Sequence, residues 1–407
     1  MTGDAPISMN IVWIFLFKVC IEFSSHYWMF KPPPDSPRFV KRLTFEGTKK
    51  EVEIMEMLLT FSSSFLLVVG LFLIVANAQP LVPAMFIFGD SVVDAGNNNH
   101  LPTIVRANFL PYGRDFINHT STGRFCNGKL ASDFTAENIG FTSYPPAYLS
   151  KEAQGTNLLI GANFASAASG FYDPTAKIYD AISLSKQLEY YKEYQRKIVG
   201  IAAKSNANAS SIISDSVYLI SAGASDFVQN YYINPLLYKK YTPDQFSDIL
   251  MQSYRIFIQC LYKLGARKIG VTNLPPLGCL PAVITVFGED SNLCVEKMNK
   301  DAVSFNNKLN ATSQILTKLS GLNLIVLDIY QPLYELVTKP AEKGFAEGRK
   351  ACCGSGLLET SILCNSKSVG TCANASEYVF WDGFHPSEAA NKILSDDLLT
   401  SGISLIF

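Results

Sequence analysis

Three residue types that together can cleave an ester occur in two short stretches at opposite ends of the chain. The first stretch, Phe-Gly-Asp-Ser, ends at Ser91, and the second, Trp-Asp-Gly-Phe-His-Pro, places Asp382 three residues before His385. A serine hydroxyl needs a base to accept its proton, and that base needs a third group to hold its tautomer. We therefore expect Ser91 to be a nucleophile, His385 its base and Asp382 the group that orients the base.

Simpler roles for the same residues stay open. Ser91 could cap a helix, because serine is favoured at helix N-termini, and His385 could be a packed loop histidine beside Pro386. The other histidines after residue 78 are His100 and His119, which stand in polar sequence, and we expect them at the surface. The sequence thus offers one histidine in a context suited to catalysis.

The elements that would position these residues alternate between apolar runs and amphipathic stretches. Residues 243–264 and 294–319 have the helical spacing of apolar side chains. The predicted strands are 84–88, 216–223, 267–274 and 322–328. Continuous apolar strands separated by amphipathic helices are typical of a parallel sheet covered on both faces. We predict one α/β/α domain, with Ser91 just past the carboxyl end of a strand, where open sheets place reactive groups.

The composition indicates a folded protein with a large core. Of 407 residues, 48% are hydrophobic and 17% are charged, and the net charge is −1. An apolar fraction of this size argues against disorder, and a nucleic-acid partner normally requires a basic stripe. We therefore expect no nucleic-acid or other polyanionic partner.

The N-terminal region differs from the rest of the chain and has the pattern of an export signal. An apolar core over 65–75 is followed by Ala-Asn-Ala at 76–78, a small-x-small cleavage pattern. We assign 57–78 as a signal peptide, 1–56 as an extension without a recognisable module, and 79–407 as the functional domain. The alternative is a signal anchor, since the apolar stretch is barely long enough to span a bilayer. A secreted, extracellular protein without a stable membrane span is the prediction.

Cysteine use agrees with export. An even number of cysteines outside the extension fits disulfides in an oxidising compartment, and buried free thiols are the alternative. We expect Cys279 to pair with Cys294 and the last four cysteines to pair among themselves. Metal binding is disfavoured, because adjacent cysteines lack the spacing of zinc ligands. The eight cysteines are Cys126, Cys260, Cys279, Cys294, Cys352, Cys353, Cys364 and Cys372.

Four asparagines lie in N-x-S/T sequons, which mark exposed loops when a protein is exported. One sequon alone is weak evidence, but together with the leader they favour a secreted glycoprotein. The four asparagines are Asn118, Asn208, Asn310 and Asn374.

Several blocks of the sequence, in order, resemble the plant-type GDSL esterase/lipases of the SGNH hydrolase superfamily, and in particular the anther-type proline-rich-protein-like members. The resemblance covers essentially residues 84 to 402. It implies a three-layer α/β/α fold with a mostly parallel five-stranded, flavodoxin-like sheet. The blocks that carry it are 88–98, 122–128, 163–170, 274–279 and 381–387.

The resemblance also implies which groups would hold the oxyanion of the reaction. These are the backbone amides of Ser91 and Gly170, and the side chain at the third position of a Gly-x-Asn-Asp block. This chain reads Gly-Ala-Ser-Asp at 223–226, so Ser225 stands where the family has asparagine. A serine hydroxyl can donate but is shorter, and loss of one donor costs about 10²–10³ in turnover. Asn230 is the nearest alternative donor.

The expected activity is hydrolysis of carboxylic esters through a Ser-His-Asp triad and an acyl-enzyme, without a metal or organic cofactor. The expected partner is a small-molecule or lipid acyl ester. Alternatives on the same scaffold are a carbohydrate acetylesterase, an acyltransferase, and a weakly active secreted binding glycoprotein.

Overall fold

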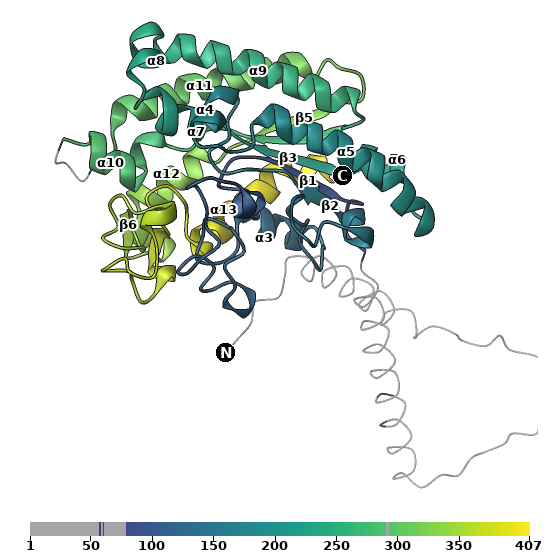
Figure 1. Cartoon of the computed structure of the whole chain (residues 1–407), viewed down its shortest axis with the longest axis horizontal. Helices are drawn as coiled ribbons and strands as arrows, with labels where there is room; N and C mark the ends of the chain where they lie inside the picture. The colour runs from purple at the N-terminus through teal and green to yellow at the C-terminus, as the bar shows by residue number, and fades with distance from the viewer. Residues whose placement is uncertain (1–56, 58–59, 61–78, 290–292) are drawn as a thin grey trace, which may run out of the picture. The chain divides into compact units, whose positions relative to one another are not determined.

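The computed structural model describes residues 79–289 and 293–407, together with Met57 and Thr60 (Figure 1). The predicted extension over 1–56 and, apart from those two residues, the predicted signal peptide over 57–78 lie outside the described part. Residues Pro80–Phe407 form one compact unit. Among the described residues, no helix has the length and apolar character needed to cross a membrane.

A five-stranded parallel sheet forms the centre of this unit, with the strand order β2-β1-β3-β4-β5. Four of its strands are the four apolar runs of the sequence, each within two residues of the predicted bounds. The fifth strand, β2, has only three residues, and a segment of this length is too short to show a strand pattern in the sequence. The strands are β1 (Met85–Gly89), β2 (Gly161–Asn163), β3 (Val217–Ser221), β4 (Lys268–Thr272) and β5 (Asn323–Leu327).

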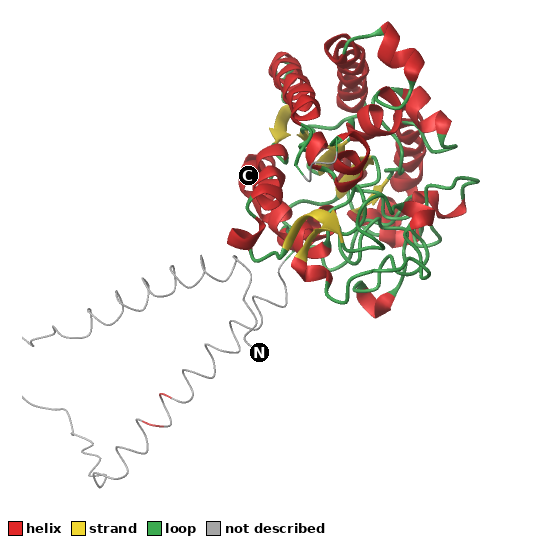
Figure 2. Cartoon of the chain, turned by 90° about the vertical axis from the view of Figure 1, so that its left-hand side faces the viewer, coloured by secondary structure: helices red, strands yellow, loops and turns green. Residues whose placement is uncertain are grey.

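Helices cover both faces of the sheet. Successive residues of a strand point to opposite faces, so each buried strand contributes side chains to two separate cores. Phe86 and Phe88 belong to a core shared with α5, α9 and α11, whereas Met85 and Ile87 belong to a core shared with α3 and α13. Figure 1 shows these two helix groups on opposite sides of the strands, and Figure 2 shows the same layers after a quarter turn. The α/β/α prediction is therefore confirmed. The covering helices are α3 (Ala131–Asn138), α5 (Leu184–Lys204), α9 (Pro243–Lys263), α11 (Glu296–Leu316), α12 (Tyr330–Thr338) and α13 (Glu388–Gly402).

The two helices predicted from periodicity are α9 and α11, and their ends follow local chemistry. Thr242 caps α9, accepting from the backbone amide of Gln245, while the Gln245 side chain accepts from the Thr242 amide. This reciprocal capping box fixes the first turn. Short helices connect the layers: α4 (Asp173–Ile178), α6 (Ala209–Ser214), α7 (Ala224–Asp226), α8 (Pro235–Lys240) and α10 (Pro281–Phe287).

A second, two-stranded parallel sheet, β6 (Glu347–Ala351) with β7 (Tyr378–Phe380), was not predicted. Two disulfides, Cys352–Cys372 and Cys353–Cys364, close the loop between these strands. Cys279–Cys294 forms the third disulfide, so the expected pairings are confirmed. Cys126 is a buried free thiol and Cys260 a half-buried one.

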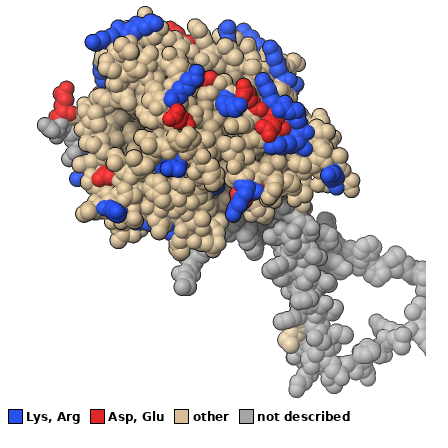
Figure 3. Space-filling model, viewed as in Figure 1, with Lys and Arg blue, Asp and Glu red and all other residues tan. Residues whose placement is uncertain are grey.

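The residues predicted at the surface are exposed, namely His100, His119 and all four sequon asparagines. Asn310, however, lies within α11 and not in a loop. On the face drawn in Figure 3, Lys and Arg side chains stand in separate groups, several of them next to Asp or Glu. This face therefore carries no continuous basic surface.

Candidate active site

Ser91 lies just past the carboxyl end of β1, where a sharp turn allows the strand to end directly against its neighbour. Gly89 has a φ of 138°, and a Cβ atom there would lie 1.8 Å from the carbonyl oxygen of Ser221 in β3. The next residue, Asp90, donates its backbone N–H to that same oxygen at 2.9 Å. Only glycine permits both the backbone angle and the close approach. The turn therefore presents Ser91 at the strand edge, with only 5% of its surface exposed.

His385 connects Ser91 to Asp382. Its Nε2 atom lies 2.7 Å from Ser91 Oγ, and its Nδ1 atom lies 2.7 Å from Asp382 Oδ1. An ionised carboxylate only accepts hydrogen bonds, so Nδ1 carries the proton and Nε2 is left to accept from the serine hydroxyl. The structure thus brings together the three residues singled out in the sequence.

A tight turn holds the carboxylate and the imidazole in this arrangement. Asp382 Oδ1 also accepts the backbone N–H groups of Phe384 and His385, each at 2.9 Å. The backbone N–H of Trp381 donates to the carbonyl of His385 at 2.8 Å, which closes the turn on its other side. The three-residue spacing between Asp382 and His385 therefore corresponds to a single tight turn, in which the Asp382 carboxylate accepts hydrogen bonds from the backbone that leads to the imidazole.

Two residues that sequence reasoning missed complete the surroundings of Asp382. Its second oxygen, Oδ2, accepts from the Tyr112 hydroxyl at 2.6 Å and from Thr360 Oγ1 at 3.1 Å. The Tyr112 hydroxyl in turn accepts from the backbone N–H of Ser361 at 2.7 Å. Burial and the adjacent Asp382 charge raise the pKa of Tyr112 well above 10, so the phenol stays protonated and donates. No local pattern marks these residues, because they come from separate loops that meet only in the fold.

The predicted oxyanion residues follow the two strands on either side of β1. Gly170 lies after β2, and Ser225 lies in α7, directly after β3. Because parallel strands end at the same edge, Ser91, Gly170 and Ser225 come from three adjacent strand ends. Ser225 is buried, as expected for a residue at a closed site.

Asp226, next to Ser225, binds the segment that follows Gly170. Its carboxylate accepts from the backbone N–H of Phe171 at 2.7 Å and from Thr175 Oγ1 at 2.7 Å. A Cβ atom at Gly170 would lie 2.1 Å from Asp226 Oδ1, so this carboxylate packs against the glycine itself. Burial raises the pKa of Asp226 to about 7, although its hydrogen-bond donors oppose that shift.

Asn230, the alternative donor considered from the sequence, is engaged in this same network. Its side-chain Nδ2 donates to Thr175 Oγ1 at 3.0 Å, and its Oδ1 accepts from Asn234 at 3.1 Å. One N–H group of this amide therefore supports the Asp226 carboxylate through Thr175.

Polar side chains of the first block fix the β2 side of the site. Asn97 Nδ2 donates to the carbonyls of Asn163 and Ala165 at 2.9 and 2.7 Å. Asp94 accepts from the Ala167 N–H at 3.0 Å, and burial raises the pKa of this carboxyl to about 6. These bonds couple the loop after Ser91 to the segment that leads to Gly170.

The comparisons with known proteins identify the family. A family model described as GDSL-like Lipase/Acylhydrolase matches residues 85–398. The chain belongs to this family. Three relatives from Arabidopsis thaliana, each named a GDSL esterase/lipase, are 72%, 61% and 58% identical to it, the last being the one named APG. The alignments cover 82%, 86% and 85% of this chain and 93%, 100% and 99% of the relatives.

This GDSL family member is accordingly an esterase/lipase-type hydrolase that acts on small-molecule esters. Within residues 79–289 and 293–407, no group of three His, Cys, Asp or Glu side chains is arranged to hold a metal ion.

Proposed function

We propose that Ser91, His385 and Asp382 form the catalytic triad of an esterase that cleaves carboxylic esters through an acyl-enzyme. The observation that carries the proposal is the continuous line of contacts from Ser91 Oγ to His385 Nε2 and from His385 Nδ1 to Asp382, each 2.7 Å long. This is the geometry in which a base can take the serine proton while an acid stabilises the resulting imidazolium.

In the proposed reaction, Ser91 Oγ attacks the ester carbonyl as its proton moves to His385 Nε2. His385 then returns the proton to the departing alcohol, which leaves the acyl group on Ser91. A water molecule, deprotonated by His385, attacks the acyl-enzyme and releases the acid. Asp382 keeps the imidazole oriented throughout.

The oxyanion that forms in each half-reaction needs fixed hydrogen-bond donors. The backbone amides of Ser91 and Gly170 are the proposed donors, with the Ser225 hydroxyl as the third. Their origin at three adjacent strand ends supports this assignment, because the rigid sheet holds the three relative to one another.

We also propose that residues 57–78 are a signal peptide and that the hydrolase domain, 79–407, is secreted. The three disulfides support this proposal, since such bonds persist in oxidising compartments. The exposure of all four sequon asparagines agrees with it.

A fluorophosphonate probe tests the nucleophile. The purified protein is expected to be labelled covalently, and Ser91→Ala is expected to abolish the labelling while leaving the folded state intact. Ser401→Ala, at an exposed serine of α13, is the matched control and should label like the wild type. Undiminished labelling of Ser91→Ala would refute the assignment.

A panel of p-nitrophenyl esters from acetate to palmitate addresses the substrate. Preference for long acyl chains identifies a lipase, whereas activity restricted to acetate favours the carbohydrate acetylesterase alternative. Addition of a large excess of an alcohol acceptor reveals an acyltransferase, because a new ester then forms in place of the free acid.

A further inference from the structure

A surface cavity of about 430 Å³ lies beside the start of α13, the helix that begins three residues after His385. This volume falls within the ~300–1,000 Å³ typical of small-molecule sites. Its walls combine carboxylates, amides, an ammonium group and one aromatic ring. They are formed by Asp115, Asn127, Phe134, Ala373, Asn374, Ala375, Ser376, Glu388, Ala389 and Lys392.

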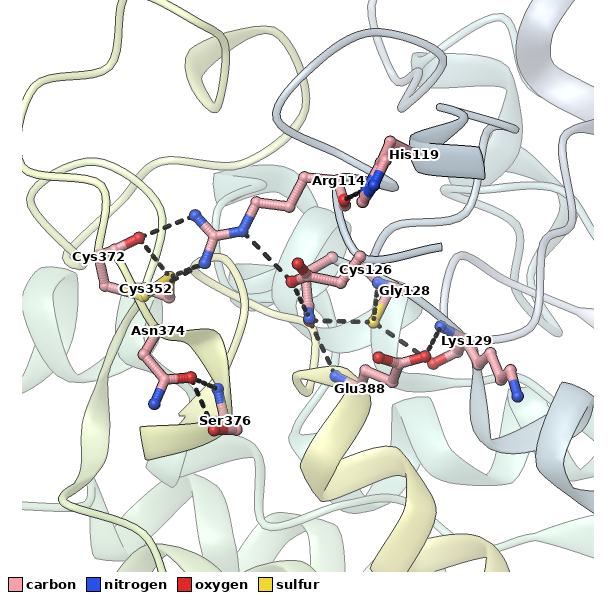
Figure 4. Close-up of polar contacts among 12 residues, drawn as sticks. Arg114, His119, Cys126, Gly128, Lys129, Cys352, Cys372, Asn374, Ser376 and Glu388 are labelled. Carbon is pink, nitrogen blue, oxygen red and sulfur yellow. Dashed lines mark hydrogen bonds and ion pairs between the residues drawn. A yellow bond between two sulfur atoms is a disulfide. The ribbon is translucent and has the colours of Figure 1, made fainter. Parts of the chain in front are cut away.

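Hydrogen bonds fix the polar walls, as Figure 4 shows. Asn127 Oδ1 accepts from the Glu388 backbone N–H at 2.9 Å, and Asn127 Nδ2 donates to Asp115 Oδ2 at 2.8 Å. Glu388 Oε1 accepts from the Lys129 backbone N–H at 3.0 Å. Burial raises the pKa of the Glu388 carboxyl, so the cavity has a partly desolvated floor. The reaction proposed above uses none of these groups.

Asn374 lies on the wall of this cavity and is the first residue of a sequon, Asn374-Ala375-Ser376. Its side-chain Oδ1 accepts from the backbone N–H of Ser376 at 3.1 Å and from the Ser376 hydroxyl at 2.7 Å. Its Nδ2 donates to Glu377 at 3.0 Å, and the residue is exposed. An amide has two N–H groups, so Nδ2 can lose one to a glycosidic bond and keep the other for Glu377.

The segment that carries Asn374 is held in place from its other side. Arg114 donates to the carbonyl of Cys372 at 2.8 Å and stacks over the Trp381 ring at 4.9 Å. Cys372 is itself tied to Cys352 by a disulfide. A group attached to Asn374 would therefore leave a fixed point on the cavity wall.

We propose that Asn374 carries an N-linked glycan whose first sugar residues occupy this cavity. In the modification, Nδ2 forms a bond to C1 of N-acetylglucosamine and releases one proton. The bond from C1 to a lipid-linked pyrophosphate breaks, and its electron pair leaves with the pyrophosphate oxygen. The inference rests on the proposed secretion, since this donor is met in the secretory pathway.

The cavity suits a sugar in two respects. Carboxylate and amide oxygens, from Asp115, Asn127 and Glu388, accept hydrogen bonds from hydroxyl groups, and the Lys392 ammonium donates to them. The half-buried Phe134 ring offers an apolar surface for the C–H face of a pyranose. A glycan seated here covers the start of α13 and adds contacts close to the turn that contains His385.

Release of the glycan by an endoglycosidase tests the proposal. The full chain is expressed in plant cells, recovered from the medium and treated with peptide N-glycosidase, both native and denatured, and each sequon is followed by mass spectrometry. We expect Asn374 to be occupied and its glycan to be released from the native protein at least tenfold more slowly than a glycan on Asn118, Asn208 or Asn310. After denaturation, the rates should converge.

Three variants sharpen this test. Ala373→Trp, at an exposed residue of the cavity wall, should fill the cavity and speed the native release without changing occupancy. Ser376→Thr should preserve occupancy, whereas Ser376→Ala should abolish it. An unmodified Asn374, or native release as fast as at another sequon, would overturn the proposal.

The esterase proposal is tested separately by measuring hydrolysis of p-nitrophenyl acetate by the same purified protein. An inactive protein with a slowly released Asn374 glycan would sustain the glycan inference and contradict the hydrolase assignment. An active protein that stays inside the cell and carries no glycans would support the hydrolase assignment and contradict the glycan inference.

Discussion

At the scale of single residues, the hydroxyl of Tyr112 has two partners on opposite sides. It donates to Asp382, and it accepts from the backbone N–H of Ser361, in the loop closed by Cys353–Cys364. Hydrogen bonds to charged groups are worth about 1.5–3 kcal/mol. In the proposed triad, Tyr112 is therefore a positioning residue that acts on His385 through Asp382.

Tyr112→Phe should lower kcat/KM for p-nitrophenyl acetate by about tenfold, because Asp382 loses a donor and holds His385 less firmly. The pH profile should change as well, because Tyr112 no longer donates to the carboxylate that holds the base. The free energy of unfolding should fall by about 1–3 kcal/mol, since the Ser361 N–H is left buried without an acceptor.

Tyr262→Phe is the matched control, because its hydroxyl bonds the Ser320 carbonyl at an exposed position. It should leave activity and the pH profile unchanged. An unaltered pH profile in Tyr112→Phe would show that Tyr112 serves packing alone.

The substitution Ser225→Asn restores the amide that the family has at this position. We expect activity to stay equal or to rise, because a planar amide fixes the direction of its donor. The measurement is kcat with p-nitrophenyl acetate, and Ser225→Ala reports what the native hydroxyl contributes. A hundredfold fall in Ser225→Asn would show that Ser225 has a role of its own.

At the scale of elements, three strand ends set the positions of the proposed oxyanion donors. β1 lies between β2 and β3, and the Asp226 carboxylate links the segment after β2 to the end of β3. The backbone of Gly170 packs against this carboxylate without room for a side chain. In the proposed mechanism, a displacement at this contact moves the Gly170 amide away from the oxyanion.

Gly170→Ala should reduce kcat by up to about 10²–10³, the effect of losing one oxyanion donor, if the displaced backbone N–H no longer reaches the oxyanion. The added methyl group would lie 2.1 Å from Asp226 Oδ1, so the Gly170 segment must shift. The measurement is steady-state kinetics with p-nitrophenyl acetate, with circular dichroism as a check on folding.

Gly200→Ala is the control, because nothing lies within 4 Å of the new methyl group in α5. It should leave kcat unchanged and raise the free energy of unfolding by about 0.5–1 kcal/mol, the difference in helix propensity. Wild-type kcat in Gly170→Ala would show that displacing the Gly170 backbone does not affect the reaction, and it would contradict a role for this amide as a precisely placed donor.

Four strands and two helices were predicted because apolar residues run continuously through the buried strands and recur at helical spacing in the helices. The apolar runs became β1, β3, β4 and β5, and the amphipathic stretches became α9 and α11. The helices α5 and α13, of 21 and 15 residues, were not predicted. Strand β2 escaped prediction because three residues carry no period. The β6–β7 pair escaped because its strands are short and half-buried, and its loop is shaped by disulfides.

The candidate site likewise contains residues that the sequence could predict and residues that it could not. Ser91, Asp382 and His385 were predictable because each stands in a distinctive short string. The contributions of Tyr112, Thr360 and Gln187 were not, because each depends on loops or helices that meet only after folding. Gln187 of α5, for example, bonds both the N–H and the carbonyl of Gly89, at 2.9 and 2.8 Å.

At the scale of the whole molecule, buried carboxyl groups make stability depend on pH. Burial raises the pKa of Asp90 to about 7, while the hydrogen bond from the Val92 backbone N–H opposes the shift. In the unfolded chain an aspartate ionises near pH ~3.9. Between these two values the folded protein holds a proton that the unfolded chain has released, so stability falls as pH rises.

Asp90→Asn removes this titration. Relative to the wild type, the variant should gain about 2–3 kcal/mol in free energy of unfolding between pH 5 and pH 8, at 1.36 kcal/mol per pKa unit. Urea denaturation of both proteins at the two pH values measures the difference. Asp248→Asn, whose carboxylate side chain is 59% exposed, should show no comparable change. A constant difference between Asp90→Asn and the wild type would contradict the buried-acid explanation.

The distance along the chain between Ser91 and His385 has a consequence for biosynthesis. Ser91 is synthesised 294 residues before the imidazole that contacts it. In the proposed triad, a nascent polypeptide that has not reached residue 385 therefore lacks the base that would activate the serine, and its alcohol stays inert. Such a chain gains the base only when the segment that carries it has been made and has folded against the end of β1.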